Sequence, residues 1–497
     1  MVLAWLLFAL YLFGTAWLGW LGHKQTSDFS SFAIGKGDLS ALQVGVTLAA
    51  ATASAATFII NPGFVYVDGL AAFMHLGLSV YLGFLFMLII LSFKFRQLGD
   101  KMGALTIPDW VGKRYGSKNF SLYFALINLL SFAFIVLLVG GISIVMQKLL
   151  GTSNSVSLLI TLGFVTTYVL IGGTYAHVYT NMLQGFMMIG VSVIVLITGF
   201  KLTFGQADFI NVLAAKGDYY LSLTNPDSRF YKDIFSTYIS GFVIGAALVC
   251  QPHILTKALY VKSDAAVKKY IFIFSIVFLL FTLLLLAGFW AHFAVEPSEL
   301  ADPSSGRFRQ DLVMTAYLKA IYPDWVFTII SIVLLAAAMS TLDGLLVGIS
   351  TITANDLIIN ILDRYHTSLT REQKMRIALK AGQFVLIVIA IAAYYVAYHP
   401  PELLGIFGQS GVYGMVLAAL CPILVGILFK KVNTKVVWGF SVLAVIIHFL
   451  LFIKGGLWFA DTDLAFENPG FTATIAAITT VVPASFYHYL KNKIKNE

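Results

Sequence analysis

Long apolar runs separated by short polar segments fill the chain, and they predict its secondary structure. A run of about 20 apolar residues without charge at its centre is long enough to cross a bilayer as an α-helix. We therefore expect an all-α integral membrane protein, residues 1–497 forming a single membrane domain. About thirteen runs qualify, near 2–21, 41–60, 70–92, 120–147, 155–173, 176–200, 234–255, 270–295, 325–355, 377–398, 402–429, 436–453 and 469–489.

The second run contains residues that make a weak membrane helix. Its stretch "AAATASAATFIINPG" (49–63) is small, β-branched and polar, and ends in Pro and Gly. One interpretation is a close-packing face of small residues. The other is a break that frees backbone carbonyls, which membranes tolerate only inside protein or along a cavity. Discontinuous helices of this kind carry the binding sites of secondary transporters. These residues alone leave both interpretations open.

The ninth run carries hydroxyl groups on one helical face. Ala337, Ser340 and Thr341 stand at i, i+3 and i+4. Two hydroxyl oxygens and a carbonyl form half an oxygen shell for a hard monovalent cation such as Na⁺. Alternatively, Ser340 and Thr341 donate back to carbonyls of their own helix.

Ionisable residues inside the runs are few, and such residues tend to mark function. Asp343, in "AAAMSTLDGLL", is the clearest, while His75, His177 and His253 lie near the ends of runs. We expect no buried Arg or Lys pair and no reactive His/Asp/Glu cluster. That expectation disfavours a proton pump and a membrane-embedded enzyme. The chain has no Walker motif, so ATP is not an evident energy source.

The positive charge follows the topology of the runs. Hydrophobic residues make up 59% of the chain and charged residues 11%, against roughly 25% charged in soluble domains. One set of alternate loops, which includes Lys257, holds 23 of the 32 lysines and arginines. The positive-inside rule assigns this set to the cytoplasm, with the N-terminus outside and the C-terminus inside. The net charge of +8 is thus a topology signal, and we expect no nucleic-acid partner.

Two of the expected outside loops are long, near 202–233 and 296–324. The second contains the amphipathic stretch "RFRQDLVMTAYLKAIYP" (307–323), which either covers an entrance or is a plain surface helix. Cys250 and Cys421 fall in apolar stretches and are expected to be packing residues. We also expect the first run to be a retained helix, since it lacks the flanks of a signal peptide.

Four stretches together resemble the sodium/solute symporter family, which includes bacterial proline, pantothenate and monocarboxylate symporters. The resemblance covers essentially the whole chain, and the four stretches are in the family's order. They are "TASAATFIINPGFVYVDG" (52–69), "YVLIGGTYAHVYTNMLQG" (168–185), "CQPHILTKAL" (250–259) and "AAAMSTLDGLL" (336–346).

The resemblance implies the inverted-repeat fold of leucine transporters, with five plus five core helices. Residues 2–21 would be an extra first helix, 41–200 the first repeat, 234–429 the second, and 436–489 two terminal helices. The helices near 41–60 and 234–255 would be broken.

The resemblance also implies binding residues. A Na⁺ site would use the carbonyls of Ala50, Ala53 and Ala337 and the hydroxyls of Ser340 and Thr341. Solute would lie beside the helix breaks. The solute candidates are Thr52, Ser54 and Thr57 on the first core helix, with His75, Gln251 and Gln409; ordinary interhelical hydrogen bonds are the alternative for His75 and Gln409.

Two departures from the family pattern affect the expected substrate and stoichiometry. The family's Thr-Asp is Thr180-Asn181 here, so Asn181 and Asp343 are candidates for a second ion or proton site, and one Na⁺ per solute is expected. Proline-type members have Asp where Thr52 stands, whereas "HPPELLGIF" (399–407) resembles pantothenate and monocarboxylate members.

The sequence thus predicts a Na⁺-coupled symporter in the plasma membrane that imports a small organic solute by alternating access. The solute would be an amino acid such as proline, or a monocarboxylate or pantothenate-like compound. A proton-coupled carrier on the same fold, with Asp343 as the proton site, and a transporter-fold solute sensor are the alternatives. The expected partners are the solute and the lipid bilayer, and the sequence does not indicate an oligomeric state.

Overall fold

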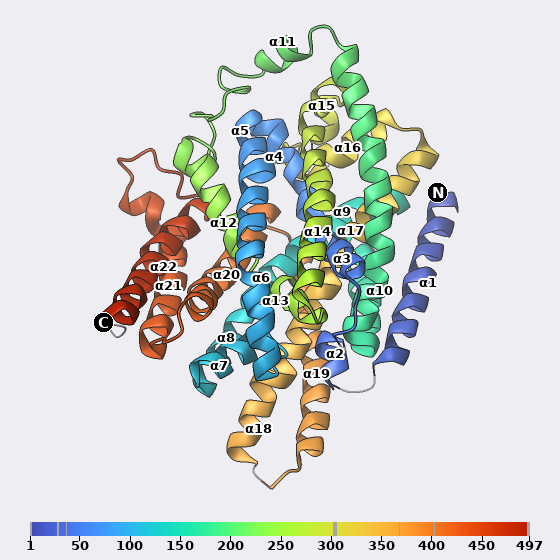
Figure 1. The fold of residues 1–497 in the computed structure, drawn as a ribbon. Helices are drawn as coiled ribbons and strands as arrows, with labels where there is room; N and C mark the ends of the chain where they lie inside the picture. Colours follow the sequence, from blue (N-terminus) through green and yellow to red (C-terminus); the bar gives the residue numbers. More distant parts are fainter. Residues whose placement is uncertain are drawn as a thin grey trace.

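A computed structural model describes residues 2–26, 29–35, 37–301, 306–366, 368–401 and 403–494. Its described part contains helices and no strand, apart from one isolated antiparallel bridge between Ala301 and Phe308. Figure 1 shows the long helices running roughly side by side as one bundle. The predicted all-α class is therefore confirmed.

The helices are of two kinds, long spanning helices and shorter pieces that join them. The long helices are α1 (Val2–Gln25), α6 (Val80–Met102), α9 (Phe132–Leu150), α10 (Asn154–Gly205), α14 (Asp264–Thr282), α17 (Asp324–Ile352), α19 (Arg371–Tyr398), α20 (Leu404–Leu428), α21 (Thr434–Trp458) and α22 (Pro469–Ile494). The shorter α-helices are α2 (Phe29–Ile34), α3 (Ala41–Thr52), α4 (Asn61–Asp68), α5 (Leu70–Phe73), α7 (Ile107–Tyr115), α8 (Lys118–Ile127), α11 (Phe209–Ala214), α12 (Ser240–Leu248), α13 (Pro252–Leu255), α15 (Ala287–Ala294), α16 (Val313–Ile321) and α18 (Ile359–Tyr365). Wider or tighter helical turns complete the set: η1 (Ala56–Ile60), η2 (Met74–Ser79), η3 (Asn128–Ser131), η4 (Phe235–Ile239), η5 (Thr256–Tyr260), η6 (Leu283–Leu286), η7 (Pro297–Leu300), η8 (Gln310–Leu312) and η9 (Thr353–Ile358).

Within the described ranges, ten helices are long and apolar enough to cross a membrane, or twelve if two bent pairs each count as one span. The bent pairs are 41–52 with 56–68, at 53°, and 235–248 with 252–260, at 63°. These are the two segments expected to be broken. The predicted run 155–173 corresponds to Asn154–Leu170, a shorter apolar helix. The exact count of thirteen is not confirmed.

The predicted runs 155–173 and 176–200 join in α10, which kinks at Gly173. Gly173 has φ 57° and ψ −145°, a conformation that only glycine adopts without strain. A Cβ atom at this position would also meet the ring of Phe32 at 2.4 Å. The kink therefore depends on glycine twice, for its backbone angles and for the close contact.

The helix α1 lies at the edge of the bundle (Figure 1) and packs on α10 through one face. Six residues make this buried face: Ala4, Phe8, Tyr11, Thr15, Gly19 and Gly22. The Tyr11 hydroxyl accepts a hydrogen bond from Gln184 Nε2 at 2.8 Å and donates one to the sulfur of Met339 at 3.5 Å. The other faces expose large apolar side chains, as expected of a helix that borders lipid.

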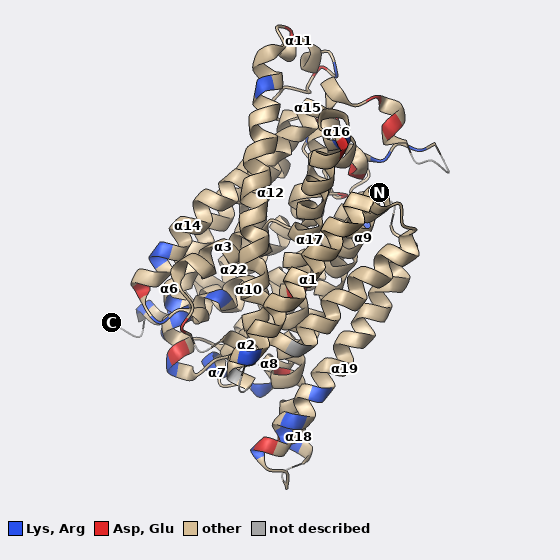
Figure 2. Ribbon diagram, turned by 90° about the vertical axis from the view of Figure 1, so that its right-hand side faces the viewer, with Lys and Arg blue, Asp and Glu red and all other residues tan. Residues whose placement is uncertain are grey.

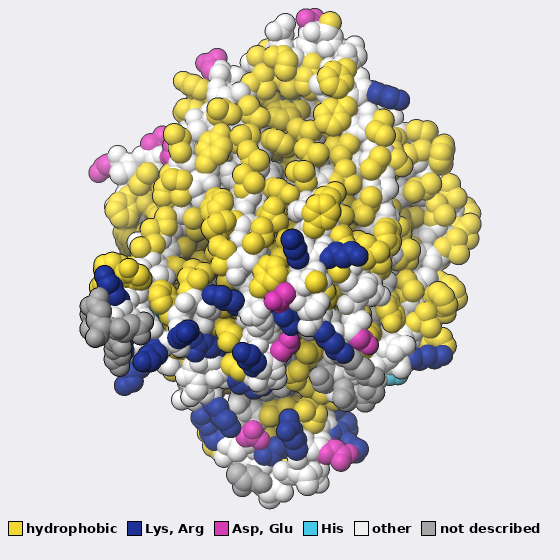
Figure 3. Space-filling model, viewed as in Figure 1, with side chains coloured by type: hydrophobic (Ala, Val, Ile, Leu, Met, Phe, Trp, Pro, Cys, Tyr) yellow, Lys and Arg dark blue, Asp and Glu magenta, His cyan; other side chains and the backbone are white. Residues whose placement is uncertain are grey.

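Charge is distributed unevenly along the long axis of the molecule. Apolar side chains cover most of the face in Figure 3, and Lys and Arg side chains gather on its lower part. Figure 2 shows basic residues on α18 and near α7 and α8. We call this the basic end, and the opposite end, which carries α11, α15 and α16, the α16 end. The asymmetry agrees with the loop charges read from the sequence.

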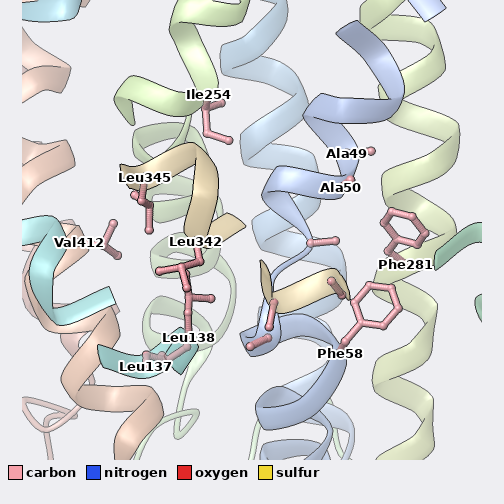
Figure 4. Packing of buried hydrophobic residues seen from close by; sticks show 14 of the residues in the cluster. Ala49, Ala50, Phe58, Leu137, Leu138, Ile254, Phe281, Leu342, Leu345 and Val412 are labelled. Atoms are coloured by element: carbon pink, nitrogen blue, oxygen red, sulfur yellow. The ribbon is translucent and has the colours of Figure 1, made fainter. Parts of the chain in front are cut away.

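The core joins the first broken helix to α17. Ala49 and Ala50 of α3 are fully buried, and Phe58 of η1 packs edge-on against Phe281 of α14 with ring centroids 5.2 Å apart. Figure 4 shows these side chains facing the same interior as Leu342 of α17. The small side chain of Ala50 faces α10, where a Cβ atom at Gly185 would lie 3.5 Å from its own Cβ, while its carbonyl faces α17.

Candidate functional site

The first half of the first broken helix, α3, ends at Thr52 because local hydrogen bonds replace the helical ones. The backbone N–H of Ser54 donates to the carbonyl of Thr52 at 3.1 Å, and the Ser54 hydroxyl accepts from the N–H of Ala56 at 3.1 Å. Such short turns compete with helix formation. The carbonyls of Ala50 and Ala51 would accept from residues 54 and 55 in a continuous helix, so the break makes them available to other donors.

The hydroxyl groups of α17 bind these two carbonyls. Ser340 Oγ donates to the carbonyl oxygen of Ala50 at 2.9 Å and to that of Ala337 at 2.7 Å, and Thr341 Oγ1 donates to that of Ala51 at 2.9 Å. Ser340 and Thr341 are fully buried. Four of the five predicted Na⁺-site residues therefore lie around one contact between α3 and α17.

The fifth predicted residue, Ala53, is buried beside the break, but its carbonyl has no contact with the α17 hydroxyls among the described hydrogen bonds. Instead, Ala51 supplies the carbonyl that Thr341 binds. The sequence interpretation missed Ala51, although it lies in the same run of small residues. The pairing follows from how the two helices meet, which the spacing within either helix does not specify.

The residue Asn181 of α10 supports the same contact. Its Nδ2 donates to the carbonyl of Ser340 at 2.8 Å, and its Oδ1 is buried without a hydrogen-bond partner in the described part of the chain. A buried amide oxygen without a donor is costly, and it is a suitable additional oxygen ligand for a cation. No described hydrogen bond joins Asn181 to Asp343, its predicted partner in a second ion or proton site.

The assignment of Lys257 to a cytoplasmic loop is wrong, and so is the expectation of no buried Lys pair. Lys257, which we assigned to a cytoplasmic loop, is 1% exposed. Its ammonium lies 2.9 Å from His177 Nε2, and His177 Nδ1 lies 2.9 Å from Asp343 Oδ1. The error arose because the second broken helix bends by 63° after Leu248 and carries Lys257 into the protein.

None of the six predicted solute residues lines one of the three cavities described in the structure. Thr52 donates to the carbonyl of Leu48 at 2.7 Å, Ser54 caps the break, and Thr57 is partly exposed. Gln251 is buried, its Nε2 donates to the carbonyl of Leu248 at 3.2 Å, and its Oε1 has no partner among the described residues. Gln409 is partly buried.

The sixth, His75, has a structural role. Its Nδ1 lies 3.0 and 2.9 Å from the carbonyls of Ser236 and Thr237, so it ties its helix to η4. Its ring lies 5.0 Å from that of Tyr231. Burial raises the pKa of the Tyr231 phenol, which precedes the span, well above its usual value. The Tyr231 phenol beside His75 therefore stays uncharged.

A large cavity opens at the α16 end. It has a volume of about 610 Å³. Its walls come from η1, α4, α9, α20 and the loops above them: Ile60, Phe64, Gly140, Ile144, Gln147, Asn154, Arg229, Arg307, Phe308, Arg309, Gln310, Asp311, Ala397, Pro400, Pro401, Leu403, Leu404 and Gly405. We call it the outer cavity. The amphipathic stretch expected near an entrance supplies five of these residues.

A second pocket, on the basic side of the Ser340 contact and next to His177 and His253, has a volume of only about 20 Å³.

Two broken membrane helices, with freed carbonyls of the first facing hydroxyls of another helix, define a secondary transporter of the discontinuous-helix class. The sequence matches the profile described as "Sodium:solute symporter family" over residues 32–440, and the chain belongs to this family. Its fold is the leucine-transporter type, as the resemblance implied, while the repeat boundaries at 41–200 and 234–429 stay a prediction.

The relatives agree with this assignment. The sodium/pantothenate symporter of Haemophilus influenzae is 24% identical over 435 residues, covering 87% of this chain and 86% of that protein. The high-affinity proline transporter of Bacillus subtilis is 24% identical over 484 residues, covering 93% and 94%. A Na⁺-coupled sialic acid symporter, solved in a substrate-bound outward-open state, has a TM-score of 0.75, 19% identity and 98% coverage of both chains, which shows a shared fold.

Proposed function

We propose that this protein is a Na⁺-coupled symporter that imports a small organic solute across the plasma membrane by alternating access. The observation that supports this most is the contact of Ser340 and Thr341 with the freed carbonyls of Ala50 and Ala51. The two hydroxyl and two carbonyl oxygens of this contact are all uncharged. Such oxygen ligands suit a monovalent cation, since a divalent ion needs carboxylates to compensate its charge.

The proposed Na⁺ ligands are the carbonyls of Ala50, Ala53 and Ala337 and the hydroxyls of Ser340 and Thr341, with Ala51 as a candidate in place of Ala53. Bound Na⁺ would hold the break in the first core helix against α17. If this raises solute affinity, solute raises Na⁺ affinity by the same factor. The membrane potential adds about 2.3 kcal/mol per charge per 100 mV to the inward driving force.

The two cavities support an outward-open starting state. The outer cavity, of about 610 Å³, opens at the α16 end, whereas the pocket beside His177 and His253 holds about 20 Å³. A hollow of about 410 Å³ at the basic end is lined by residues of α8 and α18 and by none of α3 or α17. Basic loops stay in the cytoplasm, so the basic end would face inward and the α16 end outward. The helix α1 begins away from the basic end (Figure 1), in keeping with an external N-terminus and a cytoplasmic C-terminus.

The lining of the outer cavity favours an organic anion among the candidate solutes. Three arginines line it, against one acidic residue, Asp311. Arg309 pairs with Asp311 at 2.5 Å, and Arg229 pairs with Glu467 at 2.5 Å. Guanidinium groups can also bind carboxylates in a bidentate geometry, so a lining with three arginines suits a solute that carries a carboxylate. A monocarboxylate or pantothenate-like solute would then pass inward toward Thr52, Ser54 and Thr57, with His75, Gln251 and Gln409 as the remaining candidates.

Replacing Arg307 by Gln tests the charge selection. We expect the KM for pantothenate to rise about three- to tenfold, with an unchanged maximal rate, because the cavity attracts anions less strongly. The KM for zwitterionic proline should not change, and the effect on pantothenate should shrink at high salt. Lys319→Gln is the matched control, since Lys319 is exposed on α16 and does not line the cavity. Equal changes for both solutes would contradict the selection.

Uptake into proteoliposomes tests the proposed function itself. Protein in liposomes would be given pantothenate, proline, acetate or glucose under an inward Na⁺ gradient, with choline as the control cation. Na⁺-dependent accumulation of one of them is expected. Uptake driven by a pH gradient without Na⁺ would instead support the proton-coupled carrier. Solute-induced thermal stabilisation without uptake would support the sensor.

A further inference from the structure

A lysine and an aspartate are buried inside the protein with a histidine between them. Lys257 is 1% exposed, His177 2% and Asp343 0%. They come from three elements: Lys257 from η5 in the second broken helix, His177 from α10, and Asp343 from α17. Charged groups buried in this way are rare and costly. The proposed Na⁺ and solute contacts do not use Lys257 or His177.

A charged Lys257 fixes the direction of each hydrogen bond in this chain of groups. Lys257 Nζ lies 2.9 Å from His177 Nε2, and an ammonium can only donate. His177 Nε2 is therefore the acceptor, and the neutral imidazole donates from Nδ1 to Asp343 Oδ1 at 2.9 Å. The chain reads ammonium, neutral imidazole, carboxylate, and its net charge is zero. The carbonyl of His253, 3.2 Å away, accepts a second hydrogen bond from Lys257.

The carboxylate of Asp343 has its donors from the protein. Besides His177, it accepts from the Tyr168 hydroxyl at 3.0 Å and from Thr180 Oγ1 at 3.2 Å. A buried carboxylate is stable only when it is paired and hydrogen-bonded, and here Lys257 supplies the positive charge. Asn181, the other candidate for a second ion, carries no charge and bonds to the carbonyl of Ser340.

We propose that Lys257 is a built-in counter-cation for Asp343, so that the protein binds one Na⁺ per cycle and not two. The proposal rests on the proposed Na⁺-coupled function. The Lys257 ammonium, acting through His177, compensates the one carboxylate close to the Ser340 and Thr341 site. Removing the ammonium leaves that carboxylate uncompensated and creates a demand for another small cation.

The test measures binding of ²²Na⁺ alone to the purified full-length protein, so it needs no identified solute. We expect one Na⁺ per wild-type protein and a Hill coefficient of one. Lys257→Gln should bind a second Na⁺, or recover wild-type thermal stability when methylammonium is added. The double variant Lys257→Gln with Asp343→Asn has neither the ammonium nor the carboxylate. It should therefore lose both the second Na⁺ and the stabilisation by methylammonium. Lys262→Gln is the matched control, since Lys262 is exposed five residues further along.

Each result separates the two proposals. Two Na⁺ per wild-type protein would overturn the counter-cation role and leave Na⁺ coupling intact, whereas no Na⁺ binding would overturn both. If Lys257→Gln folds only with added cation, its melting temperature across a Na⁺ and methylammonium series gives the answer. A Lys257→Gln protein with one Na⁺ and wild-type stability in choline would overturn the proposal.

Discussion

Solute uptake by the Ser340→Ala, Thr341→Ala double variant is expected to need far higher Na⁺ concentrations than uptake by the wild type. The two hydroxyls bind the freed carbonyls of Ala50 and Ala51, and they are two of the five proposed ligands. A hydrogen-bonding group that contacts a charge contributes about 1.5–3 kcal/mol. Removing two such groups weakens Na⁺ binding by about 3–6 kcal/mol. The half-saturating Na⁺ concentration should therefore rise at least about 100-fold. Initial uptake rates across a Na⁺ series in proteoliposomes measure this.

The matched control for this pair changes the same residue types elsewhere on α17. Thr328 bonds only to its own helix, at the carbonyl of Asp324, and Ser331 Oγ is buried without a partner among the described residues. Thr328→Ala with Ser331→Ala should keep the Na⁺ dependence of the wild type. A Ser340 and Thr341 double variant with the same half-saturating Na⁺ concentration as this control would show that the ion site lies elsewhere.

Replacing Gly63 by Ala is expected to slow transport about tenfold while solute binding persists. Gly63 lies on α4 under the cover of the outer cavity, where a Cβ atom would stand 2.0 Å from the backbone oxygen of Gln310. The two segments must separate by about 1 Å to relieve this contact. Overpacking of this kind costs about 1–3 kcal/mol, and about 1.4 kcal/mol against closure is a factor of ten. The KM should change less, because the cavity stays open.

Two measurements distinguish a closure defect from misfolding. Solute-induced thermal stabilisation should remain in Gly63→Ala while the maximal uptake rate falls. Gly190→Ala is the control, because Gly190 lies in α10 with no atom within 4 Å of an added Cβ. Wild-type uptake by Gly63→Ala would mean that the close packing of α4 on Gln310 is not needed for transport.

The sequence predicted the features that are local in the chain. Small, β-branched and polar residues from Ala49 onward indicated a weak helix, and the break lies there, at Ala53 and Ser54. The spacing of Ala337, Ser340 and Thr341 indicated one hydroxyl face on α17. The two interpretations of that face are both partly right, because Ser340 bonds to its own helix at Ala337 and across to Ala50.

Features that depend on packing between helices could not be predicted. Lys257 was assigned to a loop because a lysine after an apolar run is normally at a membrane surface. Its partners His177 and Asp343 are 80 and 86 residues away along the chain, and only the bent second broken helix brings the three together. For the same reason the carbonyl of Ala51, and the arginines of the outer cavity, were not recognised from spacing.

The contact between Tyr11 and Met339 has a consequence for biogenesis. These two residues are 328 positions apart in the chain, and ribosomes add about 5–20 residues per second. The helix α17, which carries Met339, is therefore synthesised about 15–65 seconds after α1. During that interval Tyr11 can already bond to Gln184 of α10, which is synthesised earlier, but not to Met339. We expect α1 to dock first on α10 and to complete its contact with α17 later.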